Sequence, residues 1–460
     1  MVARPTHFPP LPKASSQPQK VFFHTFGCQM NVYDTGKMRV QLARDGFVTT
    51  DDPAQAELII VNTCSIRDKA EQKMHSAVGR YRQLKERGQR VLLGIGGCVA
   101  QQEGETLLKR YKDVDLVFGP DGVPQIRELV AQARSGSRVL GTDFLDLEHY
   151  PFVSDVDVDP SQPFQAFVTI QKGCDNKCTF CIVPTTRGVE VSRPSQEIVA
   201  EVQELIARGV REVTLIGQNV NSYGLKLSGE KTFAQLLYAV AAVPGLERVR
   251  YTTSHPRDMG DDVVQAYRDL PQLSSHLHLP VQSGSDTMLR RMKRYYTRED
   301  YLRVVDALRG ARSDLSLTTD VIVGFPGESD EDFDATMSLL EEVRFDGSFS
   351  FKYSPRPGTP ALRLKDAVPK DVASDRLTRF QARQRELSEA YHRTYEGRTV
   401  HVLVEGQSRY DEGVVCGRTS TNVIVNFPGA KAMIGTLMHV NVTRGFVHSC
   451  RGEVLVPAVG

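Results

Sequence analysis

Apolar residues follow two alternating patterns through the first third of the chain. From residue 21 to about 140, short continuous apolar runs alternate with amphipathic stretches of helical period. The apolar runs are residues 21–26, 57–63, 90–96 and 115–119, and the amphipathic stretches are residues 33–46, 66–88, 104–111 and 124–134. Continuous apolar strands between helices are typical of a parallel sheet that is covered on both faces. We therefore expect a doubly wound α/β domain over residues 21–140.

The alternation of strands and helices begins again in the middle of the chain. The strand candidates there are residues 164–170, 212–217, 248–253, 276–280, 317–325 and 347–354, with helical stretches between them. These are fewer than the eight strands of a complete barrel. Residues 161–395 therefore favour a partial, open (β/α)6 barrel, in which the reactive groups belong at the carboxyl ends of the strands.

The pattern changes to short β runs, broken by Gly and Asn, after about residue 396. Several short strands with turn signals predict a small β-barrel over residues 396–460, in the size class of oligonucleotide-binding barrels. Residues 1–20 contain five prolines and no acidic residue, which argues against a helix and indicates a disordered tail. Residues 141–160 are acidic and lack periodicity, so they are interpreted as a linker.

Composition narrows the function less than the pattern does. The 57 basic and 56 acidic residues leave a formal charge of +1, so no overall field points to a nucleic acid or a membrane. No apolar run approaches the roughly 18 residues that span a bilayer. The chain shows no secretory signal, and its eight cysteines are expected in a reducing cytoplasm. There, clustered cysteines indicate metal or redox chemistry rather than disulfides.

Three cysteines follow directly after the first strand of the predicted barrel. Cys174, Cys178 and Cys181 have the spacing C-x3-C-x2-C. A structural zinc site prefers four ligands, and no fourth Cys or His lies nearby in the sequence. A 4Fe–4S cubane is usually held by four thiolates. Three thiolates would therefore leave one iron open to a ligand that takes part in the chemistry.

Three more cysteines are far apart in the sequence but equivalent in the predicted sheet. Cys28, Cys64 and Cys98 each lie at or just after the carboxyl end of a successive strand. Because the carboxyl ends of parallel strands emerge at one edge of a sheet, the three thiols are expected to converge there. The sequence therefore predicts a second metal site with three protein ligands.

The cysteine loop, with Phe180 before its last cysteine, resembles the signature of the radical S-adenosylmethionine (SAM) enzymes. Two three-cysteine sites followed by a small β-barrel resemble the methylthiotransferases within that group, from about Lys20 to Val456. The motifs that carry the resemblance are "FGCQMNVYD", "VNTCSIRDKAEQK", "GCDNKCTFCIVPTTRGVEVSRP", "GQNVNSYG", "TTSHP", "HLPVQSGSD" and "YSPRPGTPA". They are most similar to the branch of the family that modifies tRNA.

The resemblance implies two 4Fe–4S clusters. At the cluster of the C-x3-C-x2-C loop, the open iron would chelate the amino and carboxylate groups of SAM, and an electron would cleave SAM to a 5′-deoxyadenosyl radical. The auxiliary cluster, at Cys28, Cys64 and Cys98, would hold or supply sulfur. Gln218 and Asn219 depart from the family's common Gly-Gly-Glu pattern. The cofactor-binding residues that the resemblance implies are Phe180, Gln218, Asn219, Ser254, Gly324, Gly327 and Glu328.

The implied reaction replaces an aromatic C–H group of a tRNA adenine with C–SCH3. The substrate would be N(6)-dimethylallyladenosine, 3′-adjacent to the anticodon, and the product its 2-methylthio derivative. Two SAM molecules are implied, and no side chain is expected to act as an acid or base. The expected partners are a tRNA anticodon stem-loop carrying that adenosine and an external one-electron donor. The terminal barrel would be a TRAM-like RNA-binding module, and a cytoplasmic monomer without membrane association is expected.

One basic and aromatic stretch, residues 289–298, is a candidate RNA contact. Its composition suits phosphate binding and base stacking, and a solvated helix end is the alternative. Arg187 is left open between a cofactor contact and an RNA contact, and His255 and His278 are expected to be packing or loop residues. The candidate RNA-binding residues are Arg290, Arg291, Lys293, Arg294, Tyr295 and Tyr296.

Other functions fit parts of this pattern. A methylthiotransferase could act on a ribosomal protein or on another tRNA adenosine. An iron–sulfur carrier or an RNA-binding redox sensor would have the cysteines without turnover, but it would not need a barrel with a cofactor crevice.

Overall fold

The computed structural model describes residues 18–65, 68–146, 150–408 and 411–455. The chain forms two compact units. The first contains Met1–Asp159, Phe167–Asn176 and Ile182–Arg193, and the second contains Pro160–Ala166, Lys177–Cys181 and Pro194–Gly460. Among the described helices, none is both long enough and apolar enough to cross a membrane.

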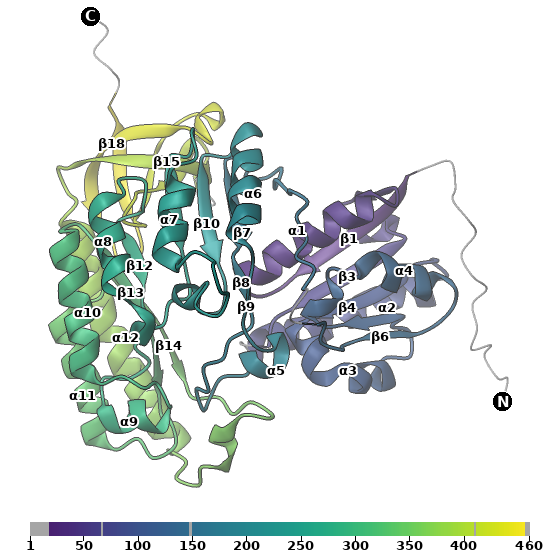
Figure 1. Cartoon of the computed structure of the whole chain (residues 1–460), viewed down its shortest axis with the longest axis horizontal. Helices are drawn as coiled ribbons and strands as arrows, with labels where there is room; N and C mark the ends of the chain where they lie inside the picture. The colour runs from purple at the N-terminus through teal and green to yellow at the C-terminus, as the bar shows by residue number, and fades with distance from the viewer. Residues whose placement is uncertain (1–17, 66–67, 147–149, 409–410, 456–460) are drawn as a thin grey trace, which may run out of the picture. The chain divides into compact units, whose positions relative to one another are not determined.

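The first unit is built on a six-stranded parallel sheet with the order β2-β1-β3-β4-β5-β6 (Figure 1). Its strands are β1 (Gln19–Thr25), β2 (Phe47–Thr49), β3 (Leu58–Thr63), β4 (Leu92–Gly97), β5 (Leu116–Phe118) and β6 (Val139–Gly141). Its helices are α1 (Gln29–Ala43), η1 (Pro53–Gln55), α2 (Asp68–Glu86), α3 (Cys98–Arg110), η2 (Pro120–Gly122) and α4 (Ile126–Arg134). The chain reverses its direction across the sheet between β1 and β3, and ligands of such folds bind at this switch point.

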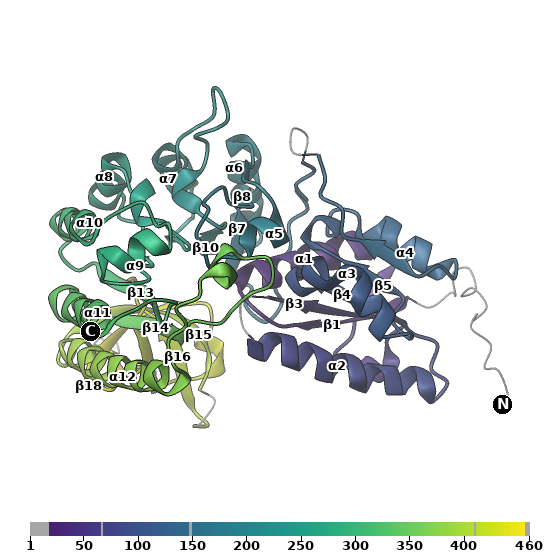
Figure 2. The same cartoon turned by 90° about the horizontal axis from the view of Figure 1, so that it is seen from below.

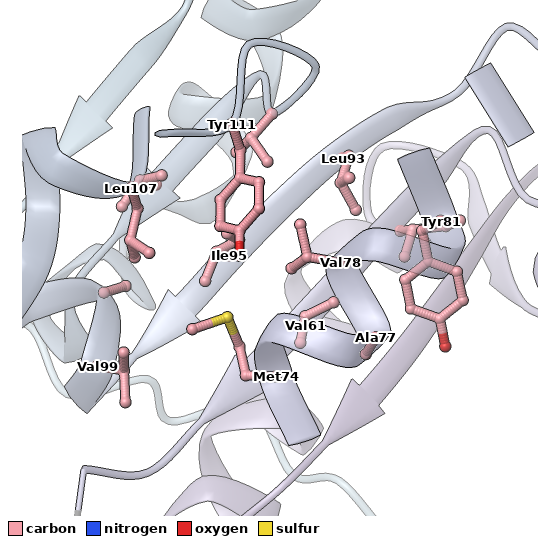
Figure 3. Packing of buried hydrophobic residues seen from close by; sticks show 14 of the residues in the cluster. Val61, Met74, Ala77, Val78, Tyr81, Leu93, Ile95, Val99, Leu107 and Tyr111 are labelled. Carbon is pink, nitrogen blue, oxygen red and sulfur yellow. The ribbon is translucent and has the colours of Figure 1, made fainter. Parts of the chain in front are cut away.

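Two apolar cores cover the two faces of this sheet. Alternate residues of β3 point to opposite faces, because side chains of a strand alternate with period two. Ile59 and Val61 pack with α2 and α3, whereas Leu58 and Ile60 pack with α1 and α4. Figure 3 shows Met74, Ala77, Val78 and Tyr81 of α2 facing Val61, Leu93 and Ile95 of the sheet. The doubly wound domain predicted from the sequence is confirmed.

The second unit contains a partial barrel. The parallel sheets β11-β10-β7 and β12-β13-β14 are joined by a bridge between Val249 and Leu273, so the strands follow one another in chain order. The strands are β7 (Gln165–Thr169, which ends in the first unit), β10 (Glu212–Ile216), β11 (Arg248–Tyr251), β12 (His276–His278), β13 (Ser316–Val323) and β14 (Gly347–Lys352). The six predicted barrel strands are therefore all present.

Helices and short 3-10 turns connect these strands, and Figure 2 shows the longer helices on the outer side of the strands. They are α6 (Ser195–Ala207), η3 (Val220–Ser222), α7 (Phe233–Ala241), η4 (Pro256–Asp258), α8 (Asp261–Asp269), α9 (Asp286–Arg291), α10 (Arg298–Ala311), α11 (Asp330–Val343), η5 (Pro360–Arg363) and α12 (Lys370–Arg393). In the first unit, the segment after β7 forms the hairpin of β8 (Gln171–Lys172) and β9 (Val191–Ser192) with α5 (Val183–Arg187) between them.

The chain ends in a closed five-stranded barrel of order β15-β16-β17-β19-β18. Its elements are β15 (Thr399–Gln407), β16 (Val414–Arg418), β17 (Ile424–Pro428), η6 (Lys431–Met433), β18 (Leu437–Gly445) and β19 (Cys450–Val454). Cys450 is buried in its apolar core, whereas Cys416 is half-buried. The small barrel is confirmed, and the domain boundaries stated above remain predictions.

Candidate metal centres and cofactor crevice

Cys28, Cys64 and Cys98 follow three adjacent strands of the first unit. Cys28 caps α1 just after β1, Cys64 follows β3, and Cys98 is the first residue of α3 after β4. These strands are neighbours in the sheet, and the switch point lies between β1 and β3. A helix N-terminus carries a partial positive charge that stabilises a nearby thiolate. Fold and sequence thus place three potential thiolate ligands at the edge where such folds bind ligands.

Two glycines allow the strand ends to approach one another at these cysteines. Gly27 has φ +130°, and a Cβ there would lie 2.4 Å from the Cβ of Cys64. Gly97 has φ +95°, and a Cβ there would lie 2.4 Å from the carbonyl oxygen of Thr63. Both backbones lie in the left-handed region that favours glycine. Any side chain at either position would push the cysteine loops apart.

An amide network joins the first cysteine loop to the second. Asn31 donates from Nδ2 to Asn62 Oδ1 (3.1 Å) and to the carbonyl of Thr63 (3.2 Å), and its Oδ1 accepts from Cys28 Sγ (3.3 Å). The sequence interpretation missed this network, because Asn31 lies in α1 and Asn62 in β3, and only the fold brings them together.

A buried ion pair lies beside the same thiols. Arg187 donates to Asp34 Oδ2 at 2.7 Å, and both side chains are largely buried. A hydrogen bond with the Cys64 thiol is the main cause that lowers the pKa of Cys28 to about 6. Burial acts in the opposite direction, and the positive charge of Arg187 lowers this pKa further. Burial is the main cause that raises the pKa of the Cys98 thiol, which Arg187 can also reach with a hydrogen bond. Arg187, left open by the sequence, therefore faces the cysteines of the first unit.

A second buried ion pair is close to the first. Lys172 Nζ lies 2.5 Å from Asp121 Oδ1 and 4.1 Å from the ring centroid of Tyr150. Tyr150 donates its hydroxyl to the same carboxylate oxygen at 3.3 Å. Together with Asp34 and Arg187, these side chains line a cavity of the first unit.

The donors around the three thiols fit an iron–sulfur cluster better than a single zinc ion. In the described part of the chain, the three sulfurs do not all lie within 4.8 Å of one another. A tetrahedral zinc with bonds of about 2.3 Å would hold its sulfurs about 3.8 Å apart. A cubane binds each thiolate through a different iron. The hydroxyls of Thr63 and Ser65, on either side of Cys64, are buried with no hydrogen-bond partner among the described residues and could donate to cluster sulfur.

The C-x3-C-x2-C loop is divided between the two units. Cys174 belongs to the first, where its N–H donates to the carbonyl of Gly188, and Cys178 and Cys181 belong to the second. Thr179 binds the end of α9: its N–H donates to Met292 O (3.0 Å) and its hydroxyl to Arg291 O (3.0 Å). Cys178 and Cys181 are therefore held on the barrel, where catalytic groups of such folds belong.

Phe180, between these two cysteines, belongs to an apolar cluster. Its ring packs edge-on against Phe325, with the centroids 6.5 Å apart, and the cluster also contains Met288 and Met292. The aromatic residue therefore anchors the loop to the segment that follows β13. Its contact with a cofactor stays a prediction.

Two of the candidate RNA-binding residues are turned into the second unit. Arg294 is 6 % and Tyr296 8 % exposed, which does not fit direct contact with RNA. Arg294 Nη1 donates to Cys178 Sγ at 3.4 Å instead. Composition could not separate these residues from their exposed neighbours, because the segment after α9 alternates inward and outward positions. Arg290, Lys293 and Tyr295 are exposed, and Arg291 is half-buried in an ion pair with Asp366.

Several polar atoms without a partner lie buried where the barrel strands end. Among the described residues they include Asn219 Oδ1 after β10, Ser254 Oγ after β11 and Glu328 Oε1 after β13. Buried polar groups are normally paired, so these atoms fit a polar ligand such as SAM. Gln218 lies beside them in sequence, and its contact with a ligand stays a prediction.

The glycines after β13 have a structural role in this unit, and their contact with a cofactor stays a prediction. Gly324 and Gly327 have φ values of +68° and +83°, and added Cβ atoms would meet Ala373 (2.6 Å) and Arg291 (2.7 Å). They are needed for a left-handed backbone and for close packing within the unit. Glu328 fixes the same turn, since its Oε2 accepts from Gly324 N (2.7 Å) and from Arg376 (2.8 Å).

Strained backbone occurs in the loops after β11 and β12 and in the segment after α9. Thr253, Gln282, Lys293 and Tyr295 have φ values between +54° and +73°. Left-handed conformations cost free energy in residues other than glycine and gather at functional sites. No sequence pattern signals them, because these residue types rarely adopt such angles.

His255 is a further side chain of this region. Its Nδ1 accepts from the N–H of Arg257 (3.3 Å), and its Nε2 is buried without a partner. Burial, followed by the charges of Arg294 and Arg257, lowers the pKa of His255 to about 2. The imidazole is therefore neutral, with its proton on Nε2, and His255 lies in the loop between β11 and η4, as the sequence predicts.

Fold and cysteines together define a radical SAM enzyme. The model of the radical SAM superfamily matches residues 168–340, that of uncharacterized protein family UPF0004 matches residues 20–119, and that of the TRAM domain matches residues 393–455. The structure of the radical SAM methyltransferase TsrM from Kitasatospora setae shares the fold, with a TM-score of 0.55 and 16 % identity over 75 % of each chain. A second structure of that methyltransferase, with a TM-score of 0.55 and 15 % identity, contains cobalamin and a [4Fe–4S] cluster.

More similar proteins narrow the family. The chain is 49 % identical to tRNA-2-methylthio-N(6)-dimethylallyladenosine synthase of Geobacter metallireducens, over 95 % of this chain and 98 % of that protein. It is 47 % identical to the protein of the same name from Thiobacillus denitrificans, over 95 % and 98 % of the two chains. The chain belongs to this family of tRNA-2-methylthio-N(6)-dimethylallyladenosine synthases.

Proposed function

We propose that the protein converts N(6)-dimethylallyladenosine, 3′-adjacent to the anticodon of tRNA, into its 2-methylthio derivative. The observation that carries this proposal is the pairing of two cysteine triads, one on a radical SAM barrel and one at the switch point of a separate sheet, in a chain that matches its relatives almost end to end. A carrier or sensor has no need of the buried unpartnered polar atoms after β10, β11 and β13.

Each cysteine triad would hold one 4Fe–4S cluster. Cys174, Cys178 and Cys181 would bind the cluster that takes SAM, and Cys28, Cys64 and Cys98 the auxiliary cluster. When bound, the SAM-binding cluster supplies the electron that generates a radical from SAM. This chemistry suits an aromatic C–H bond that polar reagents do not attack.

The side chains of the chain position these groups. Asn219, Ser254 and Glu328 would meet polar atoms of SAM, and Asn31 would hold the Cys28 loop at the auxiliary site. Arg187 would offset the negative charge of the thiolates there. The partners would be a tRNA anticodon stem-loop, read in part by the TRAM barrel, and an external one-electron donor. A cytoplasmic monomer fits this role.

Nucleoside mass spectrometry tests the substrate. Bulk tRNA from a host that lacks the modification is compared with tRNA from the same host expressing this chain. The dimethylallyl adenosine should gain the mass of a methylthio group. Cys416→Ala, at a half-buried cysteine outside both triads, should retain the activity. If SAM is cleaved but no such mass appears, the substrate is another tRNA adenosine or a ribosomal protein.

A further inference from the structure

Arg294 is a buried cation with no carboxylate in contact among the residues that the structure describes. Its guanidinium donates to Pro280 O (3.0 Å) and Tyr296 Oη (3.1 Å), which are neutral oxygens, and to Cys178 Sγ (3.4 Å). Burial raises the pKa of Tyr296, so that its hydroxyl stays neutral. A buried charge without a counter-charge is costly. Cys178 is the group in contact that can supply the negative charge.

The backbone around Arg294 is bent to make this contact. Lys293 and Tyr295, on either side of it, have φ values of +54° and +59°. They are exposed, with Tyr295 57 % accessible, whereas Arg294 is 6 % accessible. Two left-handed positions in residues other than glycine, separated by a single residue, are unfavourable and persist only where the surroundings hold them. The strained backbone at Lys293 and Tyr295 thus places the guanidinium of Arg294 at the sulfur of Cys178.

We propose that Arg294 is a positioning residue of the SAM-binding cluster, which donates to the Cys178 thiolate ligand and raises the reduction potential of that cluster. The inference rests on the proposed cluster at Cys174, Cys178 and Cys181. One-electron reduction of the [4Fe–4S]2+ core to [4Fe–4S]1+, by an external one-electron donor, changes no bond to the cysteines and adds one negative charge. A fixed cation at a ligand sulfur stabilises the more negative state. Hydrogen bonds to cluster sulfurs are a known control of the potential.

The chain offers a matched control in Arg312. This arginine donates to two backbone carbonyls, those of Leu270 and Leu273, and lies over the ring of Tyr267 at 5.9 Å. Arg294 lies over the ring of Tyr296 at 5.4 Å. Arg312 is half-buried rather than buried, and its described contacts include no cysteine, so it controls for the loss of an arginine that packs on a tyrosine ring in this unit.

The experiment is a reductive titration of the full-length enzyme carrying both clusters, without oxygen and followed by electron paramagnetic resonance. The signal that changes when SAM is added identifies the SAM-binding cluster, and its potential is then measured without SAM. At the wild-type midpoint, the ratio of reduced to oxidised cluster should fall about tenfold in Arg294→Gln, equivalent to about 59 mV for one electron. Arg294→Lys should recover most of this loss, and Arg312→Gln should show none.

Each outcome decides the proposal. A wild-type potential in Arg294→Gln with the cluster present, or an Arg294→Lys potential as low as that of Arg294→Gln, would overturn it. If Arg294→Gln cannot hold the cluster, restoration of cluster binding in Arg294→Lys supports a role of charge, and failure to restore it rejects that role. If Cys178→Ala keeps the SAM-responsive signal, the cluster assignment itself is wrong.

Discussion

The two cysteine sites each have a buried arginine beside a cysteine, but its charge is balanced differently. In the first unit Arg187 is paired with Asp34, and at Cys98 the two charges act on the thiol in opposite directions. In the second unit Arg294 meets neutral oxygens and Cys178, so its positive charge is left for the thiolate. The first arrangement suits a site that holds a cluster in one state. The second suits a site that must accept an electron.

The largest effects should separate the two sites by activity. Cys178→Ala should abolish 5′-deoxyadenosine formation, because the radical-generating cluster loses a ligand. Cys64→Ala should retain part of that activity and lose methylthio insertion completely. Both products are measured by mass spectrometry after anaerobic turnover with SAM, with iron and sulfide content as the control. Equal loss of both activities in both variants, with the remaining cluster present, would remove the division of roles.

Removing one partner of the Asp34–Arg187 pair should lower the stability of the first unit. Asp34→Asn leaves Arg187 buried without a counter-charge, which should lower the free energy of unfolding by about 3–5 kcal/mol. The midpoint of urea unfolding, followed by the fluorescence or circular dichroism of the cluster-free chain, measures this loss.

A double variant controls for simple loss of packing. Asp34→Leu with Arg187→Met replaces the pair by apolar side chains of similar volume, and it should unfold close to the wild-type midpoint. If the single and double variants are equally unstable, then the neutralisation of Arg187 by Asp34 is not what stabilises the first unit.

The cysteines and both folds could be predicted from the sequence, whereas the charges around the cysteines could not. Strand order follows from apolar periodicity, and equivalent strand ends bring Cys28, Cys64 and Cys98 to one edge of the sheet. The partners Asp34 and Arg187 are 153 residues apart, and no local pattern links them. Arg294 was grouped with its exposed neighbours, because inward and outward positions there depend on strained backbone angles.

The narrow spacing at the auxiliary site gives a third test. Gly97→Ala should destabilise the first unit by about 2–3 kcal/mol and impair auxiliary cluster binding, because its Cβ would meet Thr63 O and its φ is left-handed. Gly136 has nearly the same φ, +93°, with open space around it. Gly136→Ala should therefore cost only the strain, about 1–2 kcal/mol, and leave the cluster in place. Urea unfolding and iron content measure both, and equal effects would show that the close approach is unimportant.

The smallest effect concerns the influence of Arg294 on the pKa of His255. Burial first, and then Arg294 and Arg257, lower the pKa of His255 from 6.5 to about 2. In the unfolded chain this histidine takes up a proton below pH 6.5, but in the folded protein it does not. Its contribution to stability is therefore complete above pH 6.5 and is lost as the pH falls below it, by about 1.4 kcal/mol per pH unit.

His255→Asn, which keeps an acceptor for the N–H of Arg257, should remove this part of the pH dependence. The measurement is urea unfolding of the wild type and the variant between pH 6.5 and about 5, and their difference isolates His255 from the other histidines. Because burial is the main cause of the lowered pKa, the same series in Arg294→Gln should show the same loss of stability between pH 6.5 and about 5. A smaller loss in Arg294→Gln would mean that the folded protein takes up the proton within this range. The charge of Arg294, rather than burial alone, would then be what keeps the imidazole neutral.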